Sequence, residues 1–298
     1  MEKHAYLIMA HHQFELVQKL LILLDNPHHD FYLHIDAKAE DISKEYFTNC
    51  LHYSKIYFVP RIKVSWGDQS QIEAELILLK ESAPRHYHYY HLLSGSDLPL
   101  KPSEDIYSFF ENNYGKDFVH FSSVDPDKKV LNRISIYHPF QSKVHYTFFR
   151  KINSLCIRSQ HLLSVNRLKN TSFKIGFGAN WFSITDGLAQ YVLTKEKFIQ
   201  KYFYSGFCAD ELFLQTIILN SKFINNLYLP CTTNDYHSIQ RYIDWPRGTS
   251  KNPYVFRSSD YESLITSDYL FARKFDENVD SEIINKLFQS INKVDVIR

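Results

Sequence analysis

The chain has 298 residues and a formal net charge of +1, and it is long enough to bury a core in one large domain or two modest ones. Hydrophobic residues make up 44% and charged residues 22%, which is the balance of an ordinary soluble globular protein. Only 8 glycines are present, which argues against a glycine-rich phosphate loop. The 4 cysteines show no CxxC spacing, which argues against a disulfide framework and a zinc site.

The first half of the chain alternates short apolar segments with segments of helical periodicity. Residues 6–10, 30–36 and 56–59 are predicted strands, the second because apolar and polar side chains alternate along it. Apolar residues at helical spacing predict helices over 14–24 and around 72–79. No signal peptide and no long apolar run is present, so we expect a cytoplasmic protein that does not span a membrane.

The next segment, residues 86–93, is aromatic and apolar, as in a buried strand, and it stops at Ser94-Gly95-Ser96-Asp97. Gly95 permits backbone angles that other residues resist, and Pro99 ends a continuing strand ladder. A loop of small residues with one carboxylate, placed after a buried strand, is where open α/β sheets bind ligands. A polar turn at the end of a core strand is the alternative interpretation.

Beyond this loop, Ser103 is predicted to cap a helix, and residues 118–121 to form a further strand. The alternation predicts an α/β fold with a mostly parallel central sheet and helices on both of its faces. Because parallel strands end at one edge, we expect His11, Asp36 and Asp97 along one rim. Each alone is more often a capping or turn residue, but together they suggest a nucleotide-type cleft.

Two phosphate-binding patterns, GxGxxG and GxxxxGK[ST], are absent, which weakens the interpretations as a dehydrogenase and as a P-loop protein. The sequence contains an Asp-x-Asp pattern, Asp125-Pro126-Asp127, which can hold a divalent cation against a nucleotide diphosphate. Because a proline lies inside it and Lys128-Lys129 follow at once, we prefer to interpret it as a surface turn.

Residues 128–185 carry ten Lys or Arg side chains and no Asp or Glu, with aromatic residues interleaved. Such a segment is suited to bind anionic lipid, a phosphorylated acceptor or nucleic acid. A solvated basic face that binds no partner is an equally good interpretation. No nucleic-acid-binding motif accompanies the charge. We therefore expect peripheral membrane contact or a lipid-pyrophosphate acceptor through residues 128–174, and no nucleic acid.

A glycine-broken loop over 176–184 leads into a strand, and Cys208-Ala209-Asp210-Glu211 then opens a mostly buried helix over 212–219. Asp210 is predicted to cap this helix. Glu211 is predicted in its first turn, where the helix dipole favours an ionised carboxylate. A carboxylate held ionised at the edge of a core is suited to act as a general base. Two acids that only stabilise the helix are the alternative.

A last basic cluster lies in the C-terminal part of the chain. Phe271 and Phe275, four residues apart, are expected to anchor one face and to leave Arg273 and Lys274 projecting elsewhere. Fixed cations can neutralise a departing diphosphate without a metal, although ordinary surface charge is the alternative. The cluster comprises Arg247, Lys251, Arg257, Arg273 and Lys274.

Short motifs that are weak individually occur in a specific order between Tyr6 and about Asp276. They are Leu7-Ile8-Met9-Ala10-His11, His34-Ile35-Asp36-Ala37-Lys38, Ser65-Trp66-Gly67, Leu92-Leu93-Ser94-Gly95-Ser96-Asp97-Leu98-Pro99-Leu100-Lys101, Gly178-Ala179-Asn180-Trp181-Phe182, Asp210-Glu211 and Leu270-Phe271-Ala272-Arg273-Lys274-Phe275-Asp276. Together they resemble glycosyltransferase family 14, the core-2/I-branching β-1,6-N-acetylglucosaminyltransferases and peptide O-xylosyltransferases. The similarity is greatest to the short bacterial members.

The resemblance implies a nucleotide-sugar-binding fold of the GT-A type, inversion at the anomeric carbon, and catalysis without a divalent metal or other cofactor. It implies that Glu211 is the catalytic base and that Lys274 binds the donor diphosphate. Arg247 is the preferred second diphosphate cation, and the spacing also allows Lys251. The other residues expected to bind substrate are His11, Asp36, Trp66, Gly67, Ser96, Asp97, Trp181, Asp210 and Arg273.

The expected reaction moves N-acetylglucosamine from UDP-GlcNAc to a hydroxyl of a saccharide acceptor, in a β-1,6 linkage, during synthesis of a bacterial surface polysaccharide or lipopolysaccharide. UDP-xylose or UDP-galactose as donor and a non-catalytic glycan- or membrane-binding module are the alternatives. We expect one domain over 1–298, with a nucleotide-binding half (1–127) and an acceptor half (128–298). The Golgi anchor and disulfides of eukaryotic members do not carry over to this chain, so the expected location is cytoplasmic, peripheral on the inner membrane surface.

Overall fold

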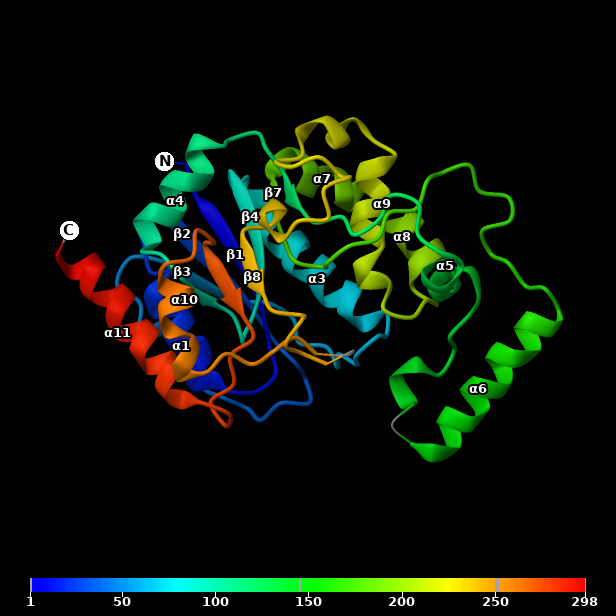
Figure 1. Ribbon diagram of the computed structural model, residues 1–298, viewed down its shortest axis with the longest axis horizontal. Coiled ribbons are helices and arrows are strands. Elements are labelled where there is room, and N and C mark those ends of the chain that lie inside the picture. Colours follow the sequence, from blue (N-terminus) through cyan, green and yellow to red (C-terminus); the bar gives the residue numbers. More distant parts are fainter. Residues whose placement is uncertain (1, 145, 250–251, 298) are drawn as a thin grey trace.

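The computed structural model describes residues 2–144, 146–249 and 252–297, with the side chains of the last helix described as far as residue 292 (Figure 1). A six-stranded sheet in the order β3-β2-β1-β4-β7-β6 forms its centre. The first four strands in this order run parallel, and β7 and β6 add antiparallel pairs at one edge. The strands are β1 (His4–Ala10), β2 (His29–Ile35), β3 (Lys55–Phe58), β4 (Tyr89–Ser94), β6 (Phe118–Val119) and β7 (Phe182–Thr185).

Strands β1 and β2 are buried on both faces, which explains the nearly continuous apolar composition of β1, and in β2 the polar residues of the alternating pattern are buried as well. Successive side chains of β1 enter two different hydrophobic cores, because side chains alternate across a strand. Tyr6 and Ile8 belong to one core, and Ala5 and Leu7 belong to the other.

Helices cover both faces of the sheet, as the sequence predicts (Figure 1). The core that contains Tyr6 and Ile8 is closed by α1 (Phe14–Leu23), α2 (Lys44–Thr48), α4 (Ser103–Asn112), α10 (Tyr261–Ile265) and α11 (Ser281–Ile297). The core on the other face is closed by α3 (Ser70–Ser82), α7 (Asp186–Thr194), α8 (Glu196–Phe203) and α9 (Phe213–Leu219). The predicted α/β architecture with a mostly parallel sheet is therefore confirmed.

Three parallel strands end together at one edge of the sheet. Ala10 pairs with Ile35, and Met9 pairs with Ser94. The pairing extends one residue beyond β2 and one residue beyond β4. The backbone amide of Asp36 donates to the Ala10 carbonyl, and that of Gly95 donates to the Met9 carbonyl, each at 2.9 Å. The residues that follow the three strands therefore leave the sheet along one rim, as predicted.

A second, three-stranded sheet closes against this rim. Its order is β5 (Leu98–Pro99), β9 (Phe271–Arg273) and β8 (Arg241–Ile243), with β5 antiparallel and β8 parallel to β9. The amide of Phe275 donates to the carbonyl of Ser96 at 2.9 Å. This small sheet therefore brings the C-terminal basic residues next to the loop that follows β4.

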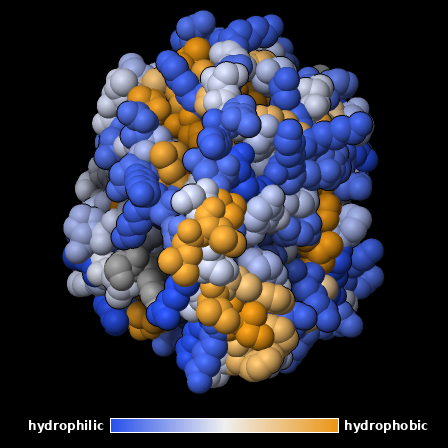
Figure 2. Space-filling view, turned by 90° about the vertical axis from the view of Figure 1, so that its right-hand side faces the viewer, coloured by the Kyte–Doolittle hydropathy of each residue, from blue (hydrophilic) through white to orange (hydrophobic). Residues whose placement is uncertain are grey.

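Helices α5 (Lys128–Ser135) and α6 (Thr147–Leu162) lie at the side of the molecule, and α6 stands apart from the central sheet (Figure 1). Figure 2 looks onto that side and shows hydrophobic residues gathered in its lower half. Within the described ranges, no helix combines the length and the apolar character needed to cross a bilayer. Short 3-10 turns complete the chain: η1 (Ala83–Arg85), η2 (Gln141–Lys143), η3 (Ala209–Glu211), η4 (Lys222–Asn226), η5 (Tyr236–Ser238) and η6 (Ser258–Asp260).

Some element ends differ from the prediction. The strand predicted over 86–93 begins later, at the start of β4, because His86 takes a positive φ of 52° after η1. The strand predicted over 118–121 shortens to β6. Ser103 does not cap α4 but is its first residue, and its hydroxyl accepts a hydrogen bond from the Asn26 amide at 3.4 Å. Contacts with residues distant in the sequence therefore determine where these helices and strands begin and end more than local propensity does.

Candidate active site

His11 leaves the sheet directly after β1, at the shared rim. Burial of its ring is the largest cause that lowers the pKa of His11, and the neighbouring His12 lowers it further. The Asp36 carboxylate opposes this shift, whereas the Lys274 ammonium adds to it. His11, Asp36 and Lys274 therefore share one electrostatic environment, although they lie far apart in the sequence.

Asp36, the residue after β2, is buried and uses its carboxylate within the protein. It accepts hydrogen bonds from the backbone amides of Lys38 at 2.8 Å and Val64 at 3.3 Å. The Lys38 ammonium lies 3.7 Å from the same carboxylate. Asp36 therefore orders the loop that leads to Trp66.

Asp97 closes the turn after β4 and is 1% exposed. Its carboxylate accepts hydrogen bonds from the Ser94 amide and hydroxyl, both at 2.9 Å, and lies 3.6 Å from Nε of Arg273. The Ser96 hydroxyl lies 3.0 Å from that of Ser94. A Cβ at Gly95 would lie only 2.9 Å from the Val17 side chain, so this turn passes close to α1. Asp97 is therefore an internal counter-charge for a cation at the rim.

Arg273, at the end of β9, is that cation. Its guanidinium lies over the Trp181 ring at 3.9 Å from the ring centroid, and its side chain is 13% exposed. Among the described residues its Nη1 has no hydrogen-bond partner, which is uncommon for a buried donor and leaves it free to bind an anion. Phe271 and Phe275 are both buried, which confirms their predicted anchoring role.

Lys274 and Arg247 differ in how their charges are used. The Lys274 side chain is half-buried and forms no ion pair with any residue in the described ranges. Arg247 donates to Asp244 at 2.5 Å and to Asp260 at 2.7 Å, so its charge is already matched by two carboxylates. Lys274 is therefore better placed than Arg247 to neutralise a ligand. Lys251, the other predicted cation, lies outside the described residues.

Glu211 ends the η3 turn and has a partly exposed carboxylate, at 34% side-chain exposure. Nη1 of Arg133, on α5, donates to its Oε2 at 2.5 Å. Burial is the largest influence and raises the pKa of Glu211, and the Arg133 charge and hydrogen bond oppose it. A partly exposed carboxylate whose pKa is raised is suited to accept a proton.

Asp210 lies beneath Glu211 and does not cap the following helix, because α9 begins at Phe213 and its preceding residue makes no side-chain cap. The Gln71 amide, on α3, donates to Asp210 Oδ2 at 3.0 Å. Burial, followed by the charge of Glu211, raises the pKa of Asp210 to about 7. Burial also raises the pKa of the enclosed Glu75 carboxyl well above its ordinary value. This acidic cluster supports the η3 turn from inside the fold.

The Trp66-Gly67 turn packs against the residues before Asp210. Gly67 has a φ of 71°, and a Cβ there would lie 2.7 Å from the Phe207 ring. Its carbonyl accepts a hydrogen bond from the Cys208 amide at 3.0 Å. Trp66 is 63% exposed and meets the Phe207 ring edge-on at a centroid distance of 5.5 Å. Gly67 therefore holds the turn against Phe207 and Cys208, and the Trp66 indole stays exposed.

The loop over 176–181 contacts the backbone of Glu211 and the side chain of Arg273. At one end the Gly178 amide donates to the Glu211 carbonyl at 3.0 Å. At the other end Trp181 lies beneath the Arg273 guanidinium. The loop has little freedom, because a Cβ at Gly178 would lie 2.0 Å from the His120 carbonyl. One loop therefore connects the backbone of Glu211 to the guanidinium of Arg273.

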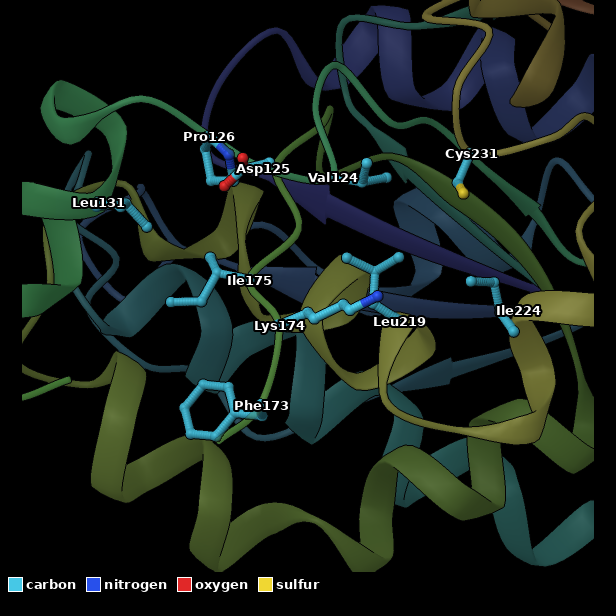
Figure 3. Close-up of a pocket in the computed structure, with 10 residues that line it drawn as sticks. All are labelled: Val124, Asp125, Pro126, Leu131, Phe173, Lys174, Ile175, Leu219, Ile224 and Cys231. Carbon is cyan, nitrogen blue, oxygen red and sulfur yellow. The ribbon is translucent and has the colours of Figure 1, made fainter. Parts of the chain in front are cut away.

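The Asp125-Pro126-Asp127 segment is a surface turn, as predicted. Asp127 caps α5 by accepting a hydrogen bond from the Val130 amide at 2.9 Å. Asp125 lines a cavity of about 550 Å³ whose walls are mostly apolar, with Lys174 as a second charged residue (Figure 3). Within the described chain, the cluster with metal-ligand geometry comprises Glu2, His88 and Glu111, and neither aspartate of the turn belongs to it.

The sequence-based prediction gives Gln71 and Glu75 no role and includes Arg133 only as one cation of the basic segment 128–185. The sequence does contain a feature that could have singled out Glu75, since it falls among apolar residues at helical spacing on α3, where a charged side chain is unusual. No sequence feature singles out Arg133, because it is one of ten cations in a single segment and its partner Glu211 is 78 residues away. Only the fold brings α5 against η3.

Replacing Arg133 with glutamine is expected to raise the pKa of Glu211, because the opposing positive charge is lost. Activity that requires ionised Glu211 is lost as pH falls through this pKa. The acidic limb of the kcat/KM profile should therefore move to higher pH in Arg133→Gln. The measurement is kcat/KM between pH 5 and 9, with Arg150→Gln, a substitution of an exposed α6 residue, as the control. An unshifted limb would show that Glu211 does not set the profile.

The fold is an α/β fold in which parallel strands end at one rim, the place where such sheets commonly bind ligands. The sequence model for the Core-2/I-Branching enzyme family matches residues 4–265. The chain therefore belongs to this family of glycosyltransferases, which confirms the resemblance based on the motifs.

Curated relatives of this chain are xylosyltransferases. Xylosyltransferase sqv-6 of Caenorhabditis elegans is 24% identical over 294 residues, which cover 90% of this chain and 34% of the relative. Xylosyltransferase 2 of Rattus norvegicus is 24% identical over 311 residues, which cover 95% of this chain and 33% of the relative. The chain thus spans about a third of the length of these relatives.

A search of solved structures found mouse xyloside xylosyltransferase 1 in its apo form. It matches with a TM-score of 0.36 and 10% sequence identity, over 91% of this chain and 97% of the mouse chain.

Proposed function

We propose that this protein is an inverting glycosyltransferase that moves a sugar from a UDP-sugar to a hydroxyl group of a saccharide acceptor. The observation that carries the proposal is the arrangement around the loop over 176–181. Gly178 of this loop hydrogen-bonds to the backbone of Glu211, whose carboxylate has a raised pKa, and Trp181 stacks under Arg273, whose Nη1 has no partner among the described residues. Membership of a glycosyltransferase family supports this assignment.

The proposed reaction is a single displacement. An acceptor hydroxyl oxygen attacks the anomeric carbon while Glu211 takes its proton, and the bond from that carbon to the UDP oxygen breaks. The diphosphate leaves with an added negative charge, which Lys274 and Arg273 neutralise by direct contact. Attack from the face opposite the leaving group inverts the configuration. No metal ion takes part in this scheme, since fixed cations supply the positive charge.

N-acetylglucosamine, from UDP-GlcNAc, is the first candidate for the transferred sugar, with a β-1,6 linkage, because the sequence motifs resemble those of β-1,6-N-acetylglucosaminyltransferases. Xylose, from UDP-xylose, is the second candidate, and the similarity to xylosyltransferases favours it. The proposed acceptor is a saccharide on a lipid carrier, as in surface polysaccharide assembly. The basic composition of residues 128–185 supports an anionic acceptor of this type.

A donor panel in EDTA tests the proposal. The protein is incubated with UDP-GlcNAc, UDP-xylose or UDP-galactose and a saccharide acceptor, with and without EDTA, and products are measured by mass spectrometry. We expect one donor to be consumed at the same rate in EDTA and its sugar to appear on the acceptor with inverted configuration by NMR. Strict dependence on manganese would overturn the metal-free scheme. Sugar binding without UDP release from any donor would mean a non-catalytic module.

A further inference from the structure

Helix α6 carries a row of apolar side chains on its outer face. Residues 148, 152, 155, 159 and 162 follow the spacing that places side chains on one face of a helix, and all but Ser159 are apolar. Phe148 is 68% exposed, Leu155 67% and Leu162 86%. Large apolar residues that are exposed together, in one row, are unusual on a soluble protein and mark an interaction surface.

The other side of α6 attaches the helix to the protein through polar contacts. Gln160 exchanges hydrogen bonds with the backbone amide and carbonyl of Tyr137 at 2.7 and 2.9 Å, and Asn153 turns its side chain into the protein, where it is buried. These contacts set the rotation of the helix about its own axis. The apolar row lies about a third of a turn or more away from Gln160 and Asn153 at 100° per residue, so it is held facing outward.

The charges on α6 have one sign. Lys151 and Arg158 flank the apolar row on one side, each exposed and each three residues from a member of the row. Arg150 is also exposed but lies nearly opposite the row. No acidic residue occurs between 128 and 185. Figure 2 shows the resulting surface, where hydrophobic residues gather in the lower half beside hydrophilic ones.

We propose that α6 lies in the interface of a membrane that contains anionic lipids, with Phe148, Leu155 and Leu162 among the acyl chains and Lys151 and Arg158 at the headgroups. An exposed apolar row bordered by lysine and arginine is the arrangement that binds a helix parallel to such a surface. A second copy of this chain fits less well, because a symmetric contact through α6 would bring cations against cations with no acid to compensate. This inference goes beyond the transferase activity and does not depend on it.

Vesicle co-sedimentation of the full chain tests the proposal. The vesicles contain phosphatidylcholine alone or phosphatidylcholine with phosphatidylglycerol. We expect binding to the anionic vesicles, weaker binding as salt is raised, and little binding to phosphatidylcholine alone. The double variant Leu155→Gln/Leu162→Gln should weaken binding about tenfold or more, because two leucines no longer leave water. Circular dichroism and thermal unfolding check that these exposed substitutions leave the fold intact.

A pair of variants that each remove one charge from the same helix makes the test specific. Arg158→Gln should weaken binding to anionic vesicles more than Arg150→Gln does, because only Arg158 borders the apolar row. Equal losses, or no loss in the leucine double variant, would overturn the proposed orientation. A concentration-dependent dimer that the double variant abolishes would show that α6 is instead an interface between copies. Glu211→Gln should bind anionic vesicles as the wild type does, which would show that membrane binding does not depend on the proposed transferase activity.

Discussion

Glu211→Gln is expected to lower kcat by about 100- to 10,000-fold, the usual contribution of a general base. The glutamine side chain is nearly isosteric and keeps an oxygen that can accept the Arg133 hydrogen bond, but it cannot take the acceptor proton. Because Glu211 is proposed to contact the acceptor and not the nucleotide, affinity for UDP should stay close to that of the wild type. Steady-state transfer assays and calorimetric titration with UDP measure the two quantities separately.

Glu262→Gln is the matched control, since Glu262 is an exposed glutamate on α10, outside the rim. It should leave both transfer and UDP affinity unchanged. If Glu211→Gln lost UDP affinity and thermal stability together with activity, Glu211 would be a structural residue and the proposed mechanism would fail. Nearly full activity in Glu211→Gln would require a different base.

Lys274→Ala is expected to lower kcat/KM by about 100- to 1,000-fold, the loss typical of removing one preorganised electrostatic contact to a developing charge. The ammonium forms no ion pair within the described chain, so its removal leaves no carboxylate unmatched. The free energy of unfolding should therefore change little, and affinity for UDP should fall. Lys274→Arg, which keeps the positive charge, should restore part of the lost activity.

Arg247→Ala gives the informative contrast. Arg247 pairs with Asp244 and Asp260, and its loss leaves two largely buried carboxylates without their counter-charge. We expect this variant to lose stability, measured by urea unfolding, more than it loses UDP affinity. Lys197→Ala, at an exposed position on α8, controls for the loss of one surface charge. Normal UDP affinity in Lys274→Ala with a large loss in Arg247→Ala would reverse the two assignments.

Much of the fold could be predicted from local sequence. The strands β1, β2 and β4 combine apolar or aromatic composition with an abrupt polar stop, and helix-period segments separate them, so a mostly parallel sheet follows from general rules. The rim with His11, Asp36 and Asp97 follows from the same rules, because parallel strands end at one edge. Element ends such as Ser103 and the start of α9 were less predictable, since they depend on contacts with distant residues.

The use of each charged side chain could not be predicted in the same way. Arg247, Arg273 and Lys274 are equivalent cations in a sequence, but the fold pairs the first with two acids, places the second over Trp181 and leaves the third without an ion pair in the described ranges. Asp97 and Asp36 were expected to bind ligand, and the structure shows both occupied by internal hydrogen bonds.

The sequence by itself determined the order of strands and helices, the residue types at the rim and the one-signed charge of the segment 128–185, because these depend on composition and spacing along the chain. Only the tertiary structure decided which cations stay free, that Arg133 reaches Glu211, and that α6 turns its apolar row outward. Ion pairing and burial depend on distances between residues that are remote in the chain, and those distances exist only once the sheet and its helices have packed together.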